Sequence, residues 1–152
     1  HLLSRRQRQM CIRDSYYKEM LQSLDDSAVL PGAFDTLKML RERGILTAVG
    51  SASKNAPLIL EKTGLLPLID KISCGLDVTK SKPDPEVFLV AASKLELAPE
   101  NCLVVEDAKA GIDAAKAGGM KSLGVGPFHD ELGADFHSRT LATVDNWEEI
   151  LC

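Results

Sequence analysis

Two adjacent carboxylates, Glu106 and Asp107, follow the apolar run CLVV at residues 102–105. Neighbouring carboxylates repel each other unless a cation lies near them. Hard oxygen ligands of this kind suit Mg²⁺, which proteins bind through a few carboxylates together with waters and substrate phosphate. The pair therefore predicts a magnesium site. The alternative is a solvated acidic turn in which Asp107 caps the following helix.

A second polar group is centred on Lys82, within the segment KSKPDP at residues 80–85. A residue that precedes proline is held in an extended conformation, so we expect the Lys82 side chain to be presented rather than packed. A lysine held in this way is a positioned point charge for a phosphate group. An ordinary surface loop at the start of a helix has a similar composition, and this alternative stays open.

The third group is the loop GSASKN at residues 50–55, which follows the apolar run ILTAV. Small residues let the backbone approach an anion closely, and free N–H groups at a helix start favour negative charge. The hydroxyls of Ser51 and Ser53 and the ammonium of Lys54 add further donors. The loop therefore predicts a phosphate site, with a plain capped helix start as the alternative.

Apolar runs and amphipathic segments alternate around these three groups. We expect strands at 45–49, 71–74, 102–105 and 122–125, helices at 33–43, 55–62, from Asp84 onward and at 110–117, and a weak strand and helix at the end. The residues expected to face inward are Phe34, Leu37 and Leu40 on the first helix and Phe88, Ala91, Ala92 and Leu95 on the third. This alternation predicts an α/β fold with a doubly wound parallel sheet. Ligands of such sheets bind beyond the carboxyl ends of the strands, where the three polar groups stand.

The bulk composition excludes several classes of protein. The 152 residues are 45% hydrophobic but only 5% aromatic, which predicts one domain with an aliphatic core. The formal net charge of −4 argues against a nucleic-acid binder. No apolar run approaches the roughly 18 residues of a membrane span. The four cysteines lack C-x-x-C spacing, so we expect reduced thiols and a cytoplasmic location.

Four motifs, in their order along the chain, resemble those of the haloacid dehalogenase (HAD) superfamily of phosphotransferases and phosphatases. The motifs are GSASKNAP, SKPDPEVF, VVEDAKAGI and GVGP. Within that superfamily they are most similar to the β-phosphoglucomutases. The resemblance runs from about residue 16 to residue 144. It implies a HAD-like core, Mg²⁺ as cofactor and a small-molecule sugar phosphate as substrate. We expect a monomer with no nucleic-acid or membrane partner.

The resemblance also implies a role for each matched residue. Ser51 and the backbone of Ala52 would hold the transferring phosphoryl group, and Lys82 would neutralise that group. Glu106 and Asp107 would be the magnesium positions, with Asp107 as the inner-shell ligand. The residues expected to grip the second, non-transferring phosphate are Ser53, Lys54 and Asn55.

The family's first strand ends in D-x-D, whose aspartates serve as nucleophile and general acid/base, and no D-x-D occurs in this sequence. We therefore expect the chain to lack that central strand and most of the helical cap, leaving a gap with unpaired strand edges on both sides. We assign residues 1–15 to a non-native leader similar to translated sequencing adapter, 16–30 to the end of the cap and 31–152 to an incomplete core. A native basic arm is the alternative for the leader, which holds four arginines and one acid.

The resemblance implies a β-phosphoglucomutase activity, which interconverts β-glucose 1-phosphate and glucose 6-phosphate through an aspartyl-phosphate and a bisphosphate. A HAD-type sugar-phosphate phosphatase is an alternative, because the shared motifs indicate phosphoryl transfer more firmly than the mutase outcome. The chain by itself, without the nucleophile, would be an inactive fragment. A receiver domain of the response-regulator kind fits less well, because its acidic pair should follow the first strand.

Overall fold

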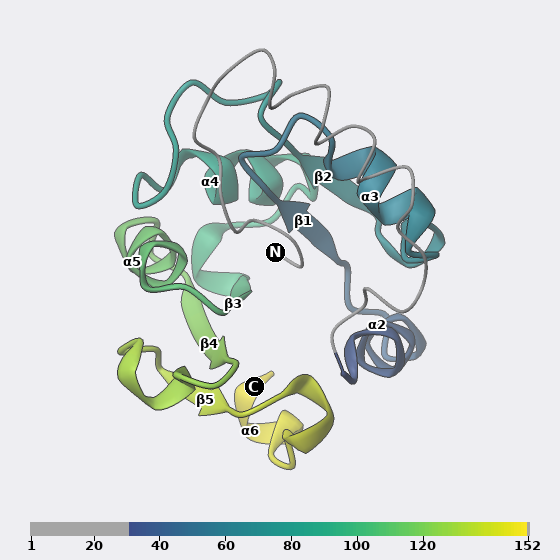
Figure 1. Ribbon diagram of the computed structural model, residues 1–152, viewed down its shortest axis with the longest axis vertical. Helices are drawn as coiled ribbons and strands as arrows, with labels where there is room; N and C mark the ends of the chain where they lie inside the picture. The colour runs from purple at the N-terminus through teal and green to yellow at the C-terminus, as the bar shows by residue number, and fades with distance from the viewer. Residues whose placement is uncertain (1–30, 152) are drawn as a thin grey trace.

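The computed structural model describes residues 31–151 (Figure 1). The strands are β1 (Ala48–Gly50), β2 (Lys71–Ser73), β3 (Leu103–Glu106), β4 (Lys121–Val125) and β5 (Phe136–Ser138). The helices are α2 (Ala33–Glu42), α3 (Ala56–Lys62), α4 (Glu86–Lys94), α5 (Lys109–Ala117) and α6 (Trp147–Ile150). Short 3₁₀ turns are η2 (Leu66–Leu68), η3 (Pro99–Asn101), η4 (His129–Glu131) and η5 (Leu141–Thr143). The assignments of residues 1–15 and 16–30 lie outside the described residues.

The described strands form two separate parallel sheets. One sheet has the order β1-β2, with Val49 opposite Ile72, and the other has the order β3-β4-β5, with Val105 opposite Leu123. Parallel strands joined by helical crossovers confirm the predicted α/β class. Among residues 31–151 β1 and β3 do not pair with each other, and the expected loss of a strand between them stays a prediction. Figure 1 shows β1 and β2 on one side of the molecule and β4 and β5 on the other.

Apolar side chains cover both faces of the three-stranded sheet. On one face Val104 packs in a buried cluster with Phe88 of α4 and Ala115 of α5. Its chain neighbours Leu103 and Val105 pack on the other face, against a cluster that contains Leu123, Val125 and Ile150. Successive side chains of a strand point to opposite faces, so the two clusters lie on opposite sides of β3. Helices on both faces are the arrangement expected of a doubly wound sheet.

The predicted strand at 45–49 begins three residues later than expected, at Ala48. Ile45 donates its N–H to Leu40 as α2 ends, and the Thr47 N–H donates to the Asp70 carboxylate at 2.8 Å. The Thr47 hydroxyl also donates to the Leu68 carbonyl at 2.8 Å. Hydrogen bonds of Thr47 to Leu68 and Asp70 therefore take the place of the strand ladder at this point.

The inward face predicted for α2 was wrong in one residue. Phe34 is 45% exposed, whereas Ala33 and Thr36 are buried and Leu37 and Leu40 are half-buried. The helix is rotated so that its inward stripe starts at Ala33 rather than at Phe34. The stripe on α4 was predicted correctly, since Phe88, Ala91 and Ala92 are all buried and Leu95 is half-buried.

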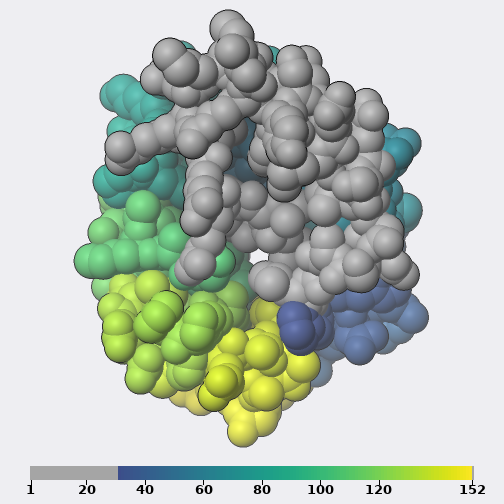
Figure 2. All heavy atoms as spheres, in the orientation of Figure 1, coloured from purple at the N-terminus to yellow at the C-terminus, as the bar shows by residue number. Residues whose placement is uncertain are grey.

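The first and last described segments lie against each other. Helix α2 contacts η5, and the purple start of the described chain meets the yellow C-terminal segment in Figure 2. A Cβ atom on Gly32 would lie 2.3 Å from the backbone nitrogen of Ala142, and Gly32 has a positive φ of 82°. Both facts require glycine at this contact. Among residues 31–151 no helix combines the length and apolarity needed to cross a bilayer, and Cys74 and Cys102 are free thiols.

Candidate functional site

Residues 50–55, which we call the serine loop, connect β1 to α3. The Ser51 N–H donates to the Ser73 carbonyl of β2 at 2.9 Å. The Ser51 hydroxyl accepts the Ser53 N–H at 3.1 Å, and the Ser53 hydroxyl accepts the Asn55 N–H at 3.1 Å. Both serines are buried. A hydroxyl that accepts an N–H still carries its own O–H donor, so these bonds shape the loop and leave its donor capacity intact.

Two glycines allow the serine loop to pack closely against its surroundings. A Cβ atom on Gly75, just after β2, would lie 2.3 Å from the Ala52 carbonyl oxygen. One on Gly50 would lie 2.7 Å from the Phe88 ring. Real Cβ atoms do not approach other atoms so closely, so either substitution would displace the loop or its neighbours. The sequence reading missed Gly75, although a glycine directly after a strand is a recognisable sign of close backbone approach.

Lys82 lies between the carboxyl ends of β1 and β3, which are in different sheets. Its ammonium donates to the Gly50 carbonyl at 3.3 Å and forms an ion pair with the Glu106 carboxylate. The same nitrogen lies 4.6 Å from the centre of the Phe88 ring. The expectation that this side chain is presented rather than packed was wrong, since it is 10% exposed. The cause is Phe88, near the start of α4, whose ring covers the lysine by a cation–π contact.

The electrostatics of Lys82 join it to both acidic residues. Burial lowers the pKa of Lys82 below its usual value, while the carboxylates of Glu106 and Asp107 act in the opposite direction. The desolvation effect is the larger of the two. The pKa of the Lys82 ammonium therefore depends on the charges of these neighbouring carboxylates. The three side chains therefore form one electrostatic unit at the carboxyl ends of β1 and β3.

Glu106 is the last residue of β3 and is 1% exposed. One carboxylate oxygen pairs with Lys82, and the other accepts the N–H groups of Asp107 and Ala108 at 3.2 and 3.3 Å. Its side chain fills the space beside Gly111 of α5, where a Cβ atom would lie 2.1 Å from the Glu106 carboxyl carbon. Lysine, backbone and α5 together hold this carboxylate in one position.

The acidic residues fit a Mg²⁺ ion in part. Asp107 and Glu106 offer the hard oxygen ligands that Mg²⁺ prefers, and this ion needs only one or two protein carboxylates when phosphate and waters complete its shell. Residues 31–151 contain no cluster of three or more acidic, histidine or cysteine side chains around a common point. That Asp107 is the direct ligand of the ion, with Glu106 beside it, stays a prediction. When bound there, the ion would supply positive charge to phosphate oxygens.

The structure thus brings part of the predicted site together. Lys82 links the serine loop, through the Gly50 carbonyl, to Glu106 and Asp107. Lys54 is exposed at the start of α3, and its Cγ lies 3.2 Å from the position of a Cβ on Gly75. The bonds described for Lys82 do not extend to Lys54 or Asn55. The roles of Ser51, Ala52, Ser53, Lys54 and Asn55 toward phosphate stay predictions.

Comparison with known proteins supplies relatives for this arrangement. The chain is 34% identical over 139 residues to β-phosphoglucomutase of Bacillus subtilis, covering 88% of the chain and 62% of that protein. It is 35% identical over 112 residues to validoxylamine A 7'-phosphate phosphatase of Streptomyces hygroscopicus, covering 72% and 53%. The crystal structure of β-phosphoglucomutase from Clostridium difficile superimposes with a TM-score of 0.85 at 30% identity, covering 91% of the chain and 62% of that structure.

The chain spans less than two thirds of the length of each of these three proteins. Its relatives include both mutases and phosphatases, so the likeness is to phosphoryl-transfer enzymes as a class. The model of the haloacid dehalogenase-like hydrolases matches residues 4–119, which is more than half of the sequence. The chain therefore belongs to the haloacid dehalogenase-like hydrolase family.

Proposed function

We propose that this chain carries the phosphate-binding and magnesium-binding part of a phosphoglucomutase-like enzyme, which interconverts β-glucose 1-phosphate and glucose 6-phosphate. The observation that carries the proposal is the position of Lys82, held between the serine loop and the Glu106–Asp107 pair. A phosphoryl group needs donors for its oxygens and positive charge to offset its own. The serine loop supplies the donors, and Lys82 supplies the charge.

Each residue has a distinct task in this proposal. The Ser51 hydroxyl and the Ala52 N–H bind oxygens of the transferring phosphoryl group. Lys82 neutralises that group, and Glu106 keeps the ammonium in place. Asp107 holds Mg²⁺ with Glu106 beside it. The residues proposed to bind the second phosphate of a hexose bisphosphate are Ser53, Lys54 and Asn55.

Binding of phosphate can be measured without turnover. We expect isothermal titration of the 152-residue chain with glucose 6-phosphate to show binding that is tighter with Mg²⁺ than without it. Lys82→Met should weaken binding by about 10- to 100-fold, the range for loss of a hydrogen bond to a charged group. Lys80→Met is the matched control, because the Lys80 side chain is 70% exposed two residues away.

Two results would contradict the phosphate site. One is equal affinity of the Lys82→Met and Lys80→Met variants. The other is equal affinity of the unchanged chain and Ser51→Ala, which serves as the second test if Lys82→Met does not fold. Circular dichroism of each variant shows whether a loss of binding reflects a loss of structure.

A sugar-phosphate phosphatase is the second candidate, favoured by the 35% identity to the validoxylamine A 7'-phosphate phosphatase. A mutase must hold two phosphates, whereas a phosphatase needs to hold one. We expect Lys54→Ala to weaken binding of glucose 1,6-bisphosphate by up to about fivefold, as for an exposed ion pair, and to leave inorganic phosphate unaffected. Lys62→Ala, at the exposed far end of α3, is the control. No difference between these two variants would favour the phosphatase.

The 152-residue chain on its own should have no measurable mutase turnover. The proposed chemistry requires an aspartate nucleophile in a D-x-D motif, and the sequence contains no such motif. A coupled assay for glucose 6-phosphate formation checks this expectation. Formation of product above the background of a heat-treated sample would contradict it.

A further inference from the structure

Residues 74–77, which we call the β2 turn, follow β2 and lie beside the serine loop. The Asp77 N–H donates to the Cys74 carbonyl at 2.9 Å and closes the turn. The Asp77 carboxylate also bonds back to the start of the turn, where one of its oxygens accepts the Cys74 N–H at 2.8 Å. The backbone and the side chain of Asp77 therefore both hold the turn in one conformation.

Lys94, the last residue of α4, holds the Asp77 carboxylate from outside the turn. Its ammonium lies 2.9 Å from the other Asp77 oxygen and donates to the Ile72 carbonyl at 2.7 Å. The Cys74 N–H, followed by the Lys94 ammonium, lowers the pKa of Asp77 below its usual value, so the carboxylate is charged at neutral pH. Asp77 and Lys94 therefore form an ion pair that joins α4 to the β2 turn.

The Lys94 ammonium also covers the outer edge of β2. The Ser73 carbonyl accepts the Ser51 N–H and therefore points toward β1. Successive carbonyls of a strand point in opposite directions, so the Ile72 carbonyl points away from β1. Residues 31–151 place no strand on that edge, and the Lys94 ammonium donates to the carbonyl there. Lys94 is thus bound both to the strand and to the turn that follows it.

The end of β2 and the β2 turn hold the serine loop at two points. The Ser51 N–H donates to the Ser73 carbonyl at 2.9 Å, and the Gly75 N–H donates to the Ser53 carbonyl at 3.3 Å. Between these two bonds, a Cβ atom on Gly75 would lie 2.3 Å from the Ala52 carbonyl oxygen. Because the packing leaves so little space, a shift of the β2 turn would displace the serine loop as well.

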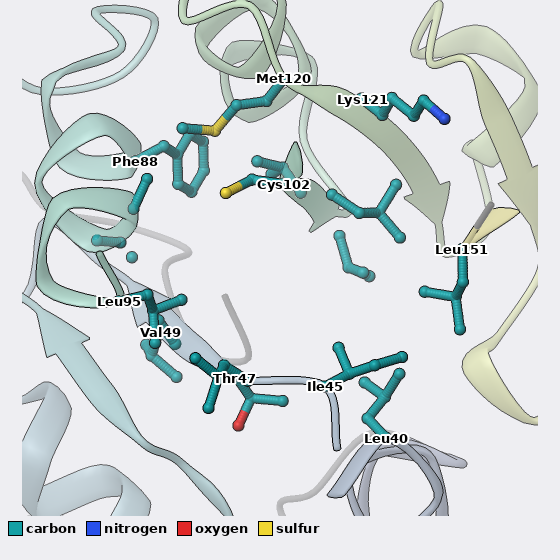
Figure 3. Close-up of a pocket in the computed structure, with 18 of the residues that line it drawn as sticks. Leu40, Ile45, Thr47, Val49, Phe88, Leu95, Cys102, Met120, Lys121 and Leu151 are labelled. Atoms are coloured by element: carbon teal, nitrogen blue, oxygen red, sulfur yellow. The ribbon is translucent and has the colours of Figure 1, made fainter. Parts of the chain in front are cut away.

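Helix α4 connects Lys94 to the other side of the candidate site. The helix packs against β1 and β2. Figure 3 shows Phe88, near its start, and Leu95, just past its end, on the wall of the cavity of about 690 Å³ between the two sheets. The Phe88 ring lies against Gly50 and the Lys82 ammonium, while Lys94 reaches the β2 turn. One helix therefore supports the surroundings of the serine loop from both of its ends.

We propose that Asp77 and Lys94 are positioning residues of the phosphate site, which act by holding the β2 turn against the serine loop. The inference rests on the proposed function, in which the serine loop binds phosphate. An isolated surface ion pair contributes little to stability. This pair differs because its hydrogen bonds converge on one turn that contacts a binding loop. A loop already held in its binding conformation loses less freedom when the ligand binds, so loss of the pair should lower phosphate affinity.

The test compares Lys94→Met with Arg43→Met, which breaks an ion pair of 2.7 Å between the end of α2 and Glu148 of α6. We expect Lys94→Met to weaken binding of glucose 6-phosphate in the presence of Mg²⁺ by about two- to tenfold, as for the loss of one hydrogen bond. Arg43→Met should bind as tightly as the unchanged chain. Lys94→Arg keeps a charged donor at this position and should recover most of the lost affinity.

Hydrogen exchange at single amides, measured by NMR, tests the positioning without phosphate. The N–H groups of Gly75 and Ser53 should exchange faster in Lys94→Met than in Arg43→Met, while amides of β4 report the overall stability of each variant. Asp77→Asn tests the other partner and replaces Lys94→Met if that variant does not fold. Asparagine keeps an oxygen for the Cys74 N–H but lacks the charge that pairs with Lys94.

Equal exchange at Gly75 and Ser53 in Lys94→Met and Arg43→Met would overturn the proposal. Faster exchange at these amides with unchanged affinity would overturn it too, because the pair would then hold the loop without serving phosphate binding. If the unchanged chain does not bind glucose 6-phosphate, the proposed function fails. The exchange rates then still decide whether Asp77 and Lys94 position the serine loop, so the two failures are distinguishable.

Discussion

Substitution of Gly111 by alanine tests whether α5 holds Glu106 in place. Alanine in a helix interior normally stabilises a protein relative to glycine, by about 0.4–1 kcal/mol. Here the new Cβ would lie 2.1 Å from the Glu106 carboxyl carbon and 2.5 Å from one carboxylate oxygen, so the side chain must move. Overpacking costs about 1–3 kcal/mol, and disturbing a buried ion pair adds to that cost. We expect Gly111→Ala to lower the free energy of unfolding by about 2–4 kcal/mol.

Urea denaturation followed by circular dichroism measures this change. With a slope of about 2 kcal/mol per molar, the midpoint should fall by about 1–2 M. The matched background is the chain with Lys82→Met and Glu106→Ala, from which both charges and the obstructing carboxylate are absent. In that background Gly111→Ala should be neutral or stabilising, so the sign of its effect reverses. If the substitution stabilises both proteins equally, Glu106 does not occupy the space beside Gly111.

Three further predictions concern the groups around the site. Lys82→Met removes the ammonium that pairs with the buried Glu106 carboxylate and should lower the free energy of unfolding by about 3–5 kcal/mol. In the same urea assay, adding Glu106→Ala to that variant should recover most of the lost free energy. Hydrogen bonds from the Thr79 N–H and, to a lesser extent, the Lys80 N–H lower the pKa of Glu86 below its usual value of 4.5. The ionised carboxylate therefore stabilises the fold above pH 4.5, and this stabilisation is lost as the pH falls through the lowered pKa. The difference in unfolding free energy between the unchanged chain and Glu86→Gln should therefore be largest near neutral pH and should shrink in acid. A difference that stays constant with pH would contradict this role of Glu86. Gly75→Ala should push the serine loop out of place and weaken phosphate binding, whereas unchanged affinity in titration calorimetry would show that the loop tolerates a side chain there.

The helices and strands could be predicted well from the sequence, because the residue patterns that indicate them lie within short stretches of the chain. The helix stripe at Phe88, Ala91 and Ala92 repeats at helical spacing, and those residues are buried. The apolar run before Glu106 is a strand, shifted by one residue. The expected βαβ alternation is likewise seen in the parallel pairing of β1 with β2 and of β3 with β4. Each of these inferences depends on residues close together in the chain or on the order of motifs.

The contacts that organise the site could not be predicted in this way. The ring of Phe88 packs on Lys82 because α4 turns back over the loop that precedes it, and the apolar pattern alone assigns Phe88 only to the core. The shortened β1 depends on Asp70, which is more than twenty residues from Thr47 in the sequence. The burial of Lys82 likewise requires Glu106, which comes from a later strand. Side-chain contacts between distant segments decide these features, and local spacing does not encode them.

The contact between α2 and η5 has a consequence for the order in which the chain folds. These segments are roughly 100 residues apart in the sequence, and Gly32 fits against Ala142 without room for a side chain. Closing so long a loop is entropically costly, so contacts of this kind form after the local βαβ units. Because α2 and the C-terminal segment also line the cavity of about 690 Å³ between the two sheets, we expect that cavity to take shape only after this late contact has formed.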